Sequence, residues 1–369
     1  MNNKIKEYHY NIDLLRFILA VMIVYYHLLP ILCNNFFDNN LLNVLSEKSR
    51  LIGRNAVDAF FILSGFFLYK SYLGKPHENT INFSLNRILR LWPTMFFSFF
   101  ILLLFGKFNL YTDVLNIFFI NSGLGITIKS SSNPATWFIC VLLFLSVFFH
   151  YIMKNVKENH LLFICSILSM CGFNILAHAK STHYASVALP SLQLTSGMVT
   201  GIACISLGVI CSILFDKIDT ANFVKLKNKI SYGLLECFLF GYFLYSSIYY
   251  KPSYNMYIYW QLVFIILLLL FTLKKGFFSK FLNNKISKIL GDFSYSIFVM
   301  HLPIITICKQ YFWGQFTPEI SALLTFISCI IFGILTHLFI EKKINRLIYQ
   351  YNVNRVENPC GARERNLLS

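Results

Sequence analysis

Long runs of apolar residues follow one another from Ile12 to Ile340, and no water-soluble block separates them. A helix needs about 20 mostly apolar residues to cross a bilayer. The pattern therefore predicts an all-α, polytopic membrane protein with about ten transmembrane helices. The apolar stretch 114–120 is too short to cross, so we expect a re-entrant or interfacial segment there. The predicted spans are residues 12–32, 52–73, 88–106, 135–152, 161–178, 196–215, 230–250, 256–273, 290–312 and 319–341.

The composition agrees with this pattern. Of 369 residues, 56% are hydrophobic and 13% are charged, and the mean hydropathy is +0.60. Soluble domains are about 45–50% apolar and about 25% charged. The formal net charge of +16 lies in short patches between apolar runs, whereas a nucleic-acid binder carries its charge on a polar surface. These values exclude a soluble enzyme, a disordered chain and a nucleic-acid-binding domain. The ten cysteines include no Cys-x-x-Cys pair, and we expect neither a metal site nor a disulfide framework.

The distribution of basic residues predicts the orientation. With a cytoplasmic N-terminus, 23 of the 32 Lys and Arg residues lie in inside segments and 8 in outside segments. Basic residues are enriched in cytoplasmic loops, so both termini are predicted to be cytoplasmic. Asp13 and Arg16 interrupt the first apolar run and no A-x-A site closes it, which predicts a retained helix and not a cleaved signal peptide. We divide the chain into a transmembrane domain, residues 1–345, and a cytoplasmic tail, residues 346–369, which is predicted to be unstructured from about residue 352.

Ionisable residues inside the first predicted helix are candidates for function. Such a residue costs at least about 2.5–3.5 kcal/mol to insert, so each is a functional hypothesis by default. Eleven residues separate Arg16 from His27, which is about 16 Å and about three turns. The two side chains therefore share roughly one face. The alternatives are that Arg16 extends to the headgroups and that His27 is a hydrogen-bonded structural residue.

The second predicted helix carries Asp58 about two turns from its outer edge, the depth expected for His27. A carboxylate at this depth would fix the tautomer of His27 and stabilise its imidazolium. A pair between Asp58 and Arg54 is the structural alternative. Ser64 and Gly65, further along the same helix, allow close approach of a neighbouring helix.

A pair of arginines, Arg87 and Arg90, precedes the third predicted span at its cytoplasmic end. Residues three apart are neighbours on a helix surface, and two guanidinium groups form a fork that suits phosphate or pyrophosphate. The alternative is an ordinary positive anchor at the membrane surface.

Six motifs follow one another along the chain: Asp13-x-x-Arg16 with ten residues before His27; Gly53-x-x-x-Val57-Asp58-x-Phe60-Phe61-x-x-Ser64-Gly65-Phe66; Arg87-x-x-Arg90-x-x-Pro93; Trp137-Phe138; Gly291-x-x-Ser294-Tyr295-x-Ile297-Phe298-x-x-His301; and Ile340-Glu341-Lys342. Taken in order, these motifs resemble the acyltransferase-3 family of bacterial integral-membrane O-acyltransferases over nearly the whole chain. The chain departs from the family pattern at two positions: Leu142 replaces a Glu that many members carry, and Lys343 replaces a frequent proline. Without this Glu, a different acceptor or a different proton path is an alternative.

The resemblance implies a multi-pass enzyme of the bacterial inner membrane. It implies transfer of an acyl group, most often acetyl, from cytoplasmic acyl-CoA to a hydroxyl of a cell-surface polysaccharide or its undecaprenyl-linked precursor, such as O-antigen, capsule or exopolysaccharide. Acetyl-CoA would be a donor substrate, and no bound cofactor is expected. His27 and Asp58 would be catalytic. The arginines Arg16, Arg87 and Arg90 would bind acyl-CoA, and the further candidates are Asp13, Ser64, Trp137, Tyr295, His301 and Glu341.

Two other functions are alternatives to an acyltransferase. A transporter or flippase of a lipid-linked sugar would use Asp58, Glu236 and His301 as a proton relay. However, the Gly and Pro interruptions do not recur in corresponding halves, as inverted repeats require. A polysaccharide polymerase would need a large outer loop, and the longest here spans about 28 residues between Gly106 and Ala135.

Overall fold

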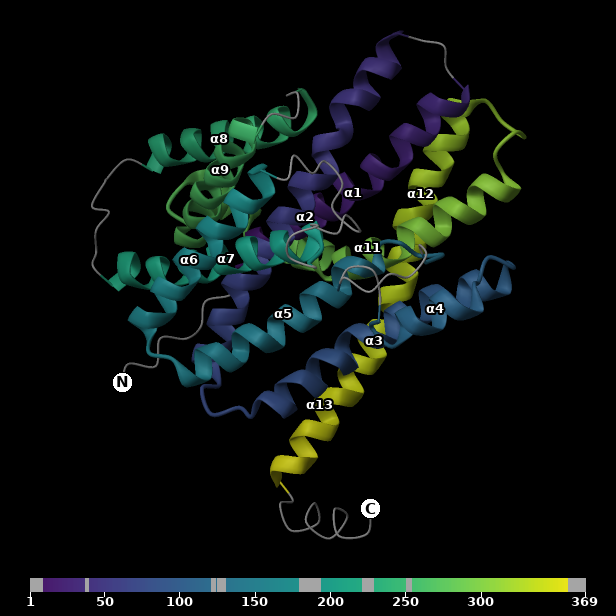
Figure 1. Ribbon diagram of the computed structural model, residues 1–369. Coiled ribbons are helices and arrows are strands. Elements are labelled where there is room, and N and C mark those ends of the chain that lie inside the picture. Colours follow the sequence, from purple (N-terminus) through teal and green to yellow (C-terminus); the bar gives the residue numbers. More distant parts are fainter. Residues whose placement is uncertain are drawn as a thin grey trace, which may run out of the picture.

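The protein is a bundle of helices, shown in Figure 1 as a computed structural model. The structure describes residues 9–36, 40–120, 124, 131–178, 194–220, 229–249 and 254–357. Within these ranges the regular secondary structure is helical throughout, which confirms the all-α prediction. The helices are α1 (Tyr10–Phe36), α2 (Asn40–Gly74), α3 (Thr80–Leu104), α4 (Leu110–Ile117), α5 (Thr136–Asn155), α6 (Glu158–His178), α7 (Ser196–Thr220), α8 (Lys229–Tyr249), α9 (Tyr254–Leu273), α10 (Phe277–Leu282), α11 (Lys285–Tyr311), α12 (Pro318–Thr336), the π-helical turn η2 (His337–Glu341) and α13 (Lys342–Glu357).

Eight helices in the described part of the chain are long and apolar enough to cross a membrane. The chain is therefore a multi-pass membrane protein. The two remaining predicted spans coincide with α8 and α9, and the part of α9 whose side chains the structure describes, Tyr259–Leu273, is a shorter apolar helix. The count of ten spans and the cytoplasmic position of the termini stay predictions. The eight candidate spans are Tyr10–Leu28, Ile52–Gly74, Thr80–Leu104, Thr136–Asn155, Glu158–His178, Ser196–Lys217, Lys285–Tyr311 and Glu319–Ile348.

Several helices extend beyond their predicted bounds, and α2 begins at Asn40, twelve residues before its predicted start at residue 52. The third begins at Thr80, eight residues before the predicted start, because Asn79 caps it: its side chain accepts a hydrogen bond from the backbone N–H of Ile81 at 3.3 Å. At the other end of the chain, α13 continues as a helix to Glu357 and projects from the bundle in Figure 1. The predicted unstructured tail is thus helical over residues 352–357, and the rest of it lies outside the described residues.

Small residues allow two central helices to touch. A Cβ added to Gly65 of α2 would lie 2.2 Å from the carbonyl oxygen of Ile205, and one added to Gly208 of α7 would lie 2.0 Å from that of Ile62. The backbones of α2 and α7 are therefore in direct contact, as expected for Gly65. Small residues at such crossings permit close packing where lipid provides no hydrophobic driving force.

The eight-residue helix α4 folds back along α3. It is about 12 Å long, which is too short to cross the membrane. The indole Nε1 of Trp92 donates to the carbonyl oxygen of Ile117, the last residue of α4, at 3.0 Å. Trp92 is the central residue of α3, so the end of α4 reaches the middle of a spanning helix. A helix too short to cross is thus found in the region predicted to be re-entrant or interfacial, and its depth in the membrane stays a prediction.

Candidate active site

Arg16 of α1 and Arg87 and Arg90 of α3 form what we call the arginine cluster. Arg87 lies within electrostatic range of both Arg16 and Arg90. Arg87 Nη2 donates to Ser146 Oγ at 3.1 Å, and Arg16 Nη1 lies 3.4 Å from Asp13 Oδ1. Guanidinium groups within electrostatic range repel one another, and an anion bound among them would relieve the repulsion. The cluster is therefore suited to phosphate groups, for which the planar donor fork of arginine has the right geometry.

Tyr295 of α11 borders the arginine cluster. Its hydroxyl donates to the carbonyl oxygen of Leu91 at 2.5 Å, which ties α11 to the helix that carries Arg87 and Arg90. Tyr295 is also within electrostatic range of Arg90 and of Glu341. Helix α11 also packs closely on α1 here. A Cβ added to Gly291 would lie 2.4 Å from the Cβ of Asp13, so only glycine permits this approach.

Glu341 lies buried at the end of η2, within electrostatic range of Tyr295. Its Oε2 accepts a hydrogen bond from Ser296 Oγ at 2.6 Å and lies 3.1 Å from His337 Nδ1. Single π-helical turns inside α-helices are frequent at functional sites. The structure thus brings three candidate residues from separate predicted helices, Asp13, Tyr295 and Glu341, around the arginine cluster.

About 16 Å further along α1, His27 meets His301 of α11. The ring centres are 5.1 Å apart and the ring planes are tilted by 40°. We call these two residues the histidine pair. His301 has no exposed surface, and its Nδ1 lies 2.5 Å from the carbonyl oxygen of Phe298. A carbonyl oxygen only accepts hydrogen bonds, so Nδ1 of His301 carries the proton.

Asp58 accepts a hydrogen bond that the sequence did not predict. Its Oδ2 accepts a hydrogen bond from Gln261 Nε2 of α9 at 2.8 Å, and both side chains are buried. Asn55, one turn earlier, donates to Ser247 Oγ of α8 at 3.2 Å. Asp58 therefore belongs to a polar contact that ties α2 to α8 and α9. Its proposed action on His27 stays a prediction, since the ring contacts of His27 in the described structure are with Tyr26 at 4.8 Å and with His301.

The other candidates on α2 and α5 make contacts that stabilise the helices and their packing. Ser64 Oγ donates to the carbonyl oxygen of Phe60 in its own helix at 2.7 Å. Trp137 packs against the rings of Phe61 and Phe138. Leu142 lies one turn before Ser146, the partner of Arg87, so the departure from the family pattern falls beside the arginine cluster.

A short loop before α5 carries polar residues that the sequence motifs did not single out. Asp113 Oδ1 of α4 accepts hydrogen bonds from Ser131 Oγ at 3.1 Å and from Ser132 N at 2.9 Å. The loop in turn places Asn133, whose Nδ2 donates to the carbonyl oxygen of Val299, two residues before His301. In the sequence, the one sign of this polar loop is Asp113, the acid that precedes the short apolar segment 114–120.

Glu236 of α8 has a defined role in the fold. Its Oε2 accepts a hydrogen bond from Ser279 N at 2.8 Å, and its Oε1 accepts from Gly276 N at 3.3 Å and from Ser279 Oγ at 2.8 Å. These amides form the N-terminus of α10, where a carboxylate satisfies N–H groups that have no partner in the helix. The carboxylate caps a helix from a neighbouring element.

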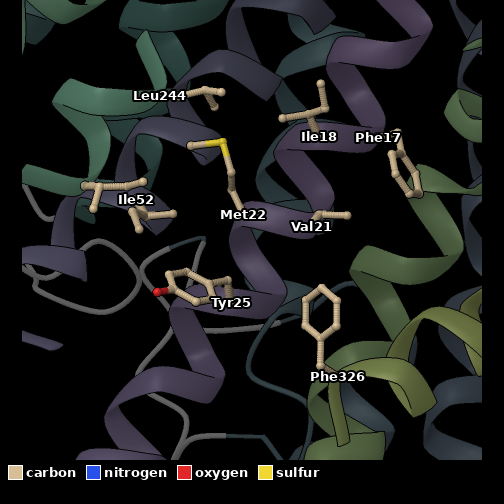
Figure 2. Close-up of a pocket in the computed structure, with 9 residues that line it drawn as sticks. Phe17, Ile18, Val21, Met22, Tyr25, Ile52, Leu244 and Phe326 are labelled. Carbon is tan, nitrogen blue, oxygen red and sulfur yellow. The ribbon is translucent and has the colours of Figure 1, made fainter. Parts of the chain in front are cut away.

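An apolar cavity of about 240 Å³ lies against the other side of α1. Figure 2 shows Ile18, Met22 and Tyr25 of α1 lining it together with side chains from α2, α8 and α12. At 100° per residue, these positions lie opposite the face that carries Arg16 and His27. The cavity therefore lies on the opposite side of α1 from the arginine cluster and the histidine pair.

Comparison with known proteins identifies one family. The model of the Acyltransferase domain family, acyltransferase-3, matches residues 9–340, about nine-tenths of the chain. No curated protein and no solved structure matches the chain. The matched region contains both the arginine cluster and the histidine pair. The chain belongs to the acyltransferase-3 family of membrane acyltransferases.

Proposed function

We propose that the chain is an O-acyltransferase of the bacterial inner membrane. Its donor is cytoplasmic acyl-CoA, most often acetyl-CoA, and its acceptor is a hydroxyl of a cell-surface polysaccharide or its lipid-linked precursor. The observation that carries this proposal is the arrangement along α1 and α11. A cluster of three arginines lies at one end of this helix pair, and two histidine rings in contact lie about 16 Å away.

The arrangement matches the chemistry of the two substrates. The phosphates of acyl-CoA would bind Arg16, Arg87 and Arg90, and the extended pantetheine arm would carry the thioester toward His27. The acceptor hydroxyl would approach from the opposite side of the membrane. With a cytoplasmic N-terminus, as the basic residues predict, the arginine cluster faces the compartment in which acyl-CoA is made.

His27 would then act as the general base. It takes the proton of the acceptor hydroxyl while the oxygen attacks the thioester carbonyl, so an ester C–O bond forms and the C–S bond breaks. The proton passes to the departing CoA thiolate. A second route with the same balance has His27 carry the acyl group before transfer. We assign Asp58 to positioning α2 through Gln261.

A transporter with a proton relay has less support. Its three candidate groups have separate surroundings: Glu236 caps α10, Asp58 accepts from Gln261 and His301 contacts His27. A relay needs groups that pass a proton from one to the next, whereas the carboxylate of Glu236 is bound by backbone and hydroxyl donors. The acyltransferase proposal, in contrast, uses the arginine cluster and the contact between His27 and His301.

The test is label transfer in membranes that contain the protein. Acetyl-labelled acetyl-CoA is added, and base-labile label is followed into the glycan fraction of the host. General-base catalysis contributes about 10²–10⁴-fold, so His27→Ala at equal abundance should lose at least 100-fold in rate. Retention of more than a tenth of the wild-type rate would make His27 structural. Absence of transfer from both acetyl-CoA and succinyl-CoA would instead favour the transporter.

A further inference from the structure

His301 has a buried nitrogen that the proposed mechanism leaves unused. Since Nδ1 donates its proton to the Phe298 carbonyl, Nε2 of the neutral ring is an acceptor. In the described part of the chain, Nε2 is buried without a hydrogen-bond partner. A buried acceptor left unsatisfied costs about 1–3 kcal/mol. Such a cost is consistent with an atom that receives its partner during the reaction.

The ring beside His301 can supply that partner. An N–H···N bond of about 2.9 Å between two imidazoles places their ring centres about 5 Å apart. The centres of His27 and His301 are 5.1 Å apart, but the planes are tilted by 40°. A rotation of the partly exposed His27 ring would bring one N–H toward Nε2 of the fully buried His301. Catalytic hydrogen bonds are often misaligned without substrate and tighten when it binds.

We propose that His301 is the positioning residue for His27. Its Nε2 accepts the N–H of His27, which leaves the other nitrogen of His27 unprotonated and available to the acceptor hydroxyl. The same hydrogen bond stabilises the imidazolium that forms when His27 takes the hydroxyl proton. His301 would thus fix the tautomer of His27 and stabilise its imidazolium, the role that the sequence analysis predicted for Asp58. The proposal rests on the proposed function, because it requires His27 to act as a base.

Two substitutions separate the two nitrogens of His301. An asparagine places its amide near the position of Nδ1, so His301→Asn keeps a donor for the Phe298 carbonyl and removes the acceptor. A glutamine extends to the position of Nε2, so His301→Gln provides an amide oxygen as acceptor toward His27. A merely structural role predicts that Asn is the better replacement, whereas a positioning role predicts that Gln is.

A matched control exists at His178. Its Nδ1 also contacts a backbone carbonyl of its own helix, that of Asn174 at 3.0 Å, but the side chain is exposed at the end of α6. His178→Asn and His178→Gln should both transfer label at the wild-type rate. They measure what the loss of an imidazole bound to a helix carbonyl does by itself.

The experiment measures transfer from labelled acetyl-CoA at equal membrane abundance. We expect His301→Asn to lower the maximal rate 10- to 100-fold with the apparent KM for acetyl-CoA within twofold, and His301→Gln to stay within tenfold of wild type. In a His27→Ala background, His301→Asn should cause no further loss. Equal losses in the two variants, or better activity with Asn than with Gln, would overturn the proposal.

The failures of the two proposals are distinguishable. If the wild-type protein transfers no label, the proposed function fails. If it transfers label and the His301 variants follow the structural order, only the role of His301 fails. Should His301→Asn not accumulate in the membrane, His301→Gln decides alone, since a loss of more than tenfold at normal abundance contradicts the proposal.

Discussion

Three guanidinium groups held close together determine what one end of the bundle can bind. Arg87 and Arg90 lie one turn apart on α3, and Arg16 approaches Arg87 from α1. The sequence could predict the first two as neighbours, because residues three apart share a helix face. It could not show that Arg16 lies within electrostatic range of Arg87, because that depends on how α1 and α3 pack.

Removal of this charge should weaken donor binding. We expect Arg87→Gln and Arg90→Gln each to raise the apparent KM for acetyl-CoA at least tenfold, because a hydrogen bond to a charged group contributes about 1.5–3 kcal/mol. The maximal rate should change less than the KM. Lys154→Gln is the control, since it removes the same charge from an exposed position in the last turn of α5. An unchanged KM in the arginine variants would place the donor site elsewhere.

Asp58 allows its two proposed roles to be separated. Asparagine at this position still offers an oxygen to Gln261 Nε2, so Asp58→Asn should keep the tie to α9 and transfer label within tenfold of wild type. Asp58→Ala leaves the buried Gln261 amide without its acceptor, and a loss of about 1–3 kcal/mol in stability should follow. Thermal unfolding in detergent and the transfer assay measure the two effects. A loss of more than 100-fold in Asp58→Asn at normal stability would restore Asp58 as the partner of His27.

Helices were easier to predict from this sequence than their contacts. Every predicted span overlaps a described helix, because runs of about 20 apolar residues leave few other structures in a membrane. Membrane helices are apolar on both the lipid-facing and the buried side, so the pattern does not indicate which face meets which neighbour. The shared face of Arg16 and His27 follows from the helical period alone. The turn of Asp58 toward Gln261 and the approach of His301 to His27 depend on packing and required the structure.

The crossing of α2 and α7 should be sensitive to a single methyl group. In Gly208→Ala, the new Cβ would lie 2.0 Å from the carbonyl oxygen of Ile62, which belongs to the backbone and cannot rotate away. Overpacking typically costs about 1–3 kcal/mol, so the thermal midpoint in detergent should fall by several degrees. Gly241→Ala in α8 is the control, because nothing lies within 4 Å of its added Cβ. It should be neutral or slightly stabilising, since alanine favours helices over glycine. Equal midpoints for the two variants would contradict direct backbone contact.

The number of crossings and the side of the termini are separable questions for the whole molecule. The uncertain helices, α8 and α9, are consecutive, so counting both or neither leaves the direction of α11 and α12 unchanged. Eight and ten crossings therefore both place the two termini on one side. With 21 and 20 residues, α8 and α9 are each about 30 Å long, which matches the hydrocarbon thickness. We expect both to cross.

The segment between α8 and α9 decides the count. It contains Lys251, which lies outside the described residues and is predicted to face the exterior. In a background with all ten cysteines replaced by alanine, Lys251→Cys should react with a membrane-impermeant maleimide in intact cells. Lys275→Cys, after α9, should react only once the cells are opened, because it lies on the cytoplasmic side in both arrangements. If Lys251→Cys is also protected, α8 and α9 remain on the cytoplasmic side. In that case the polar tie from Asp58 to Gln261 could not lie at the outer end of α2. The labelling pattern thus tests the depth at which α2 and the histidine pair are placed, as well as the number of crossings.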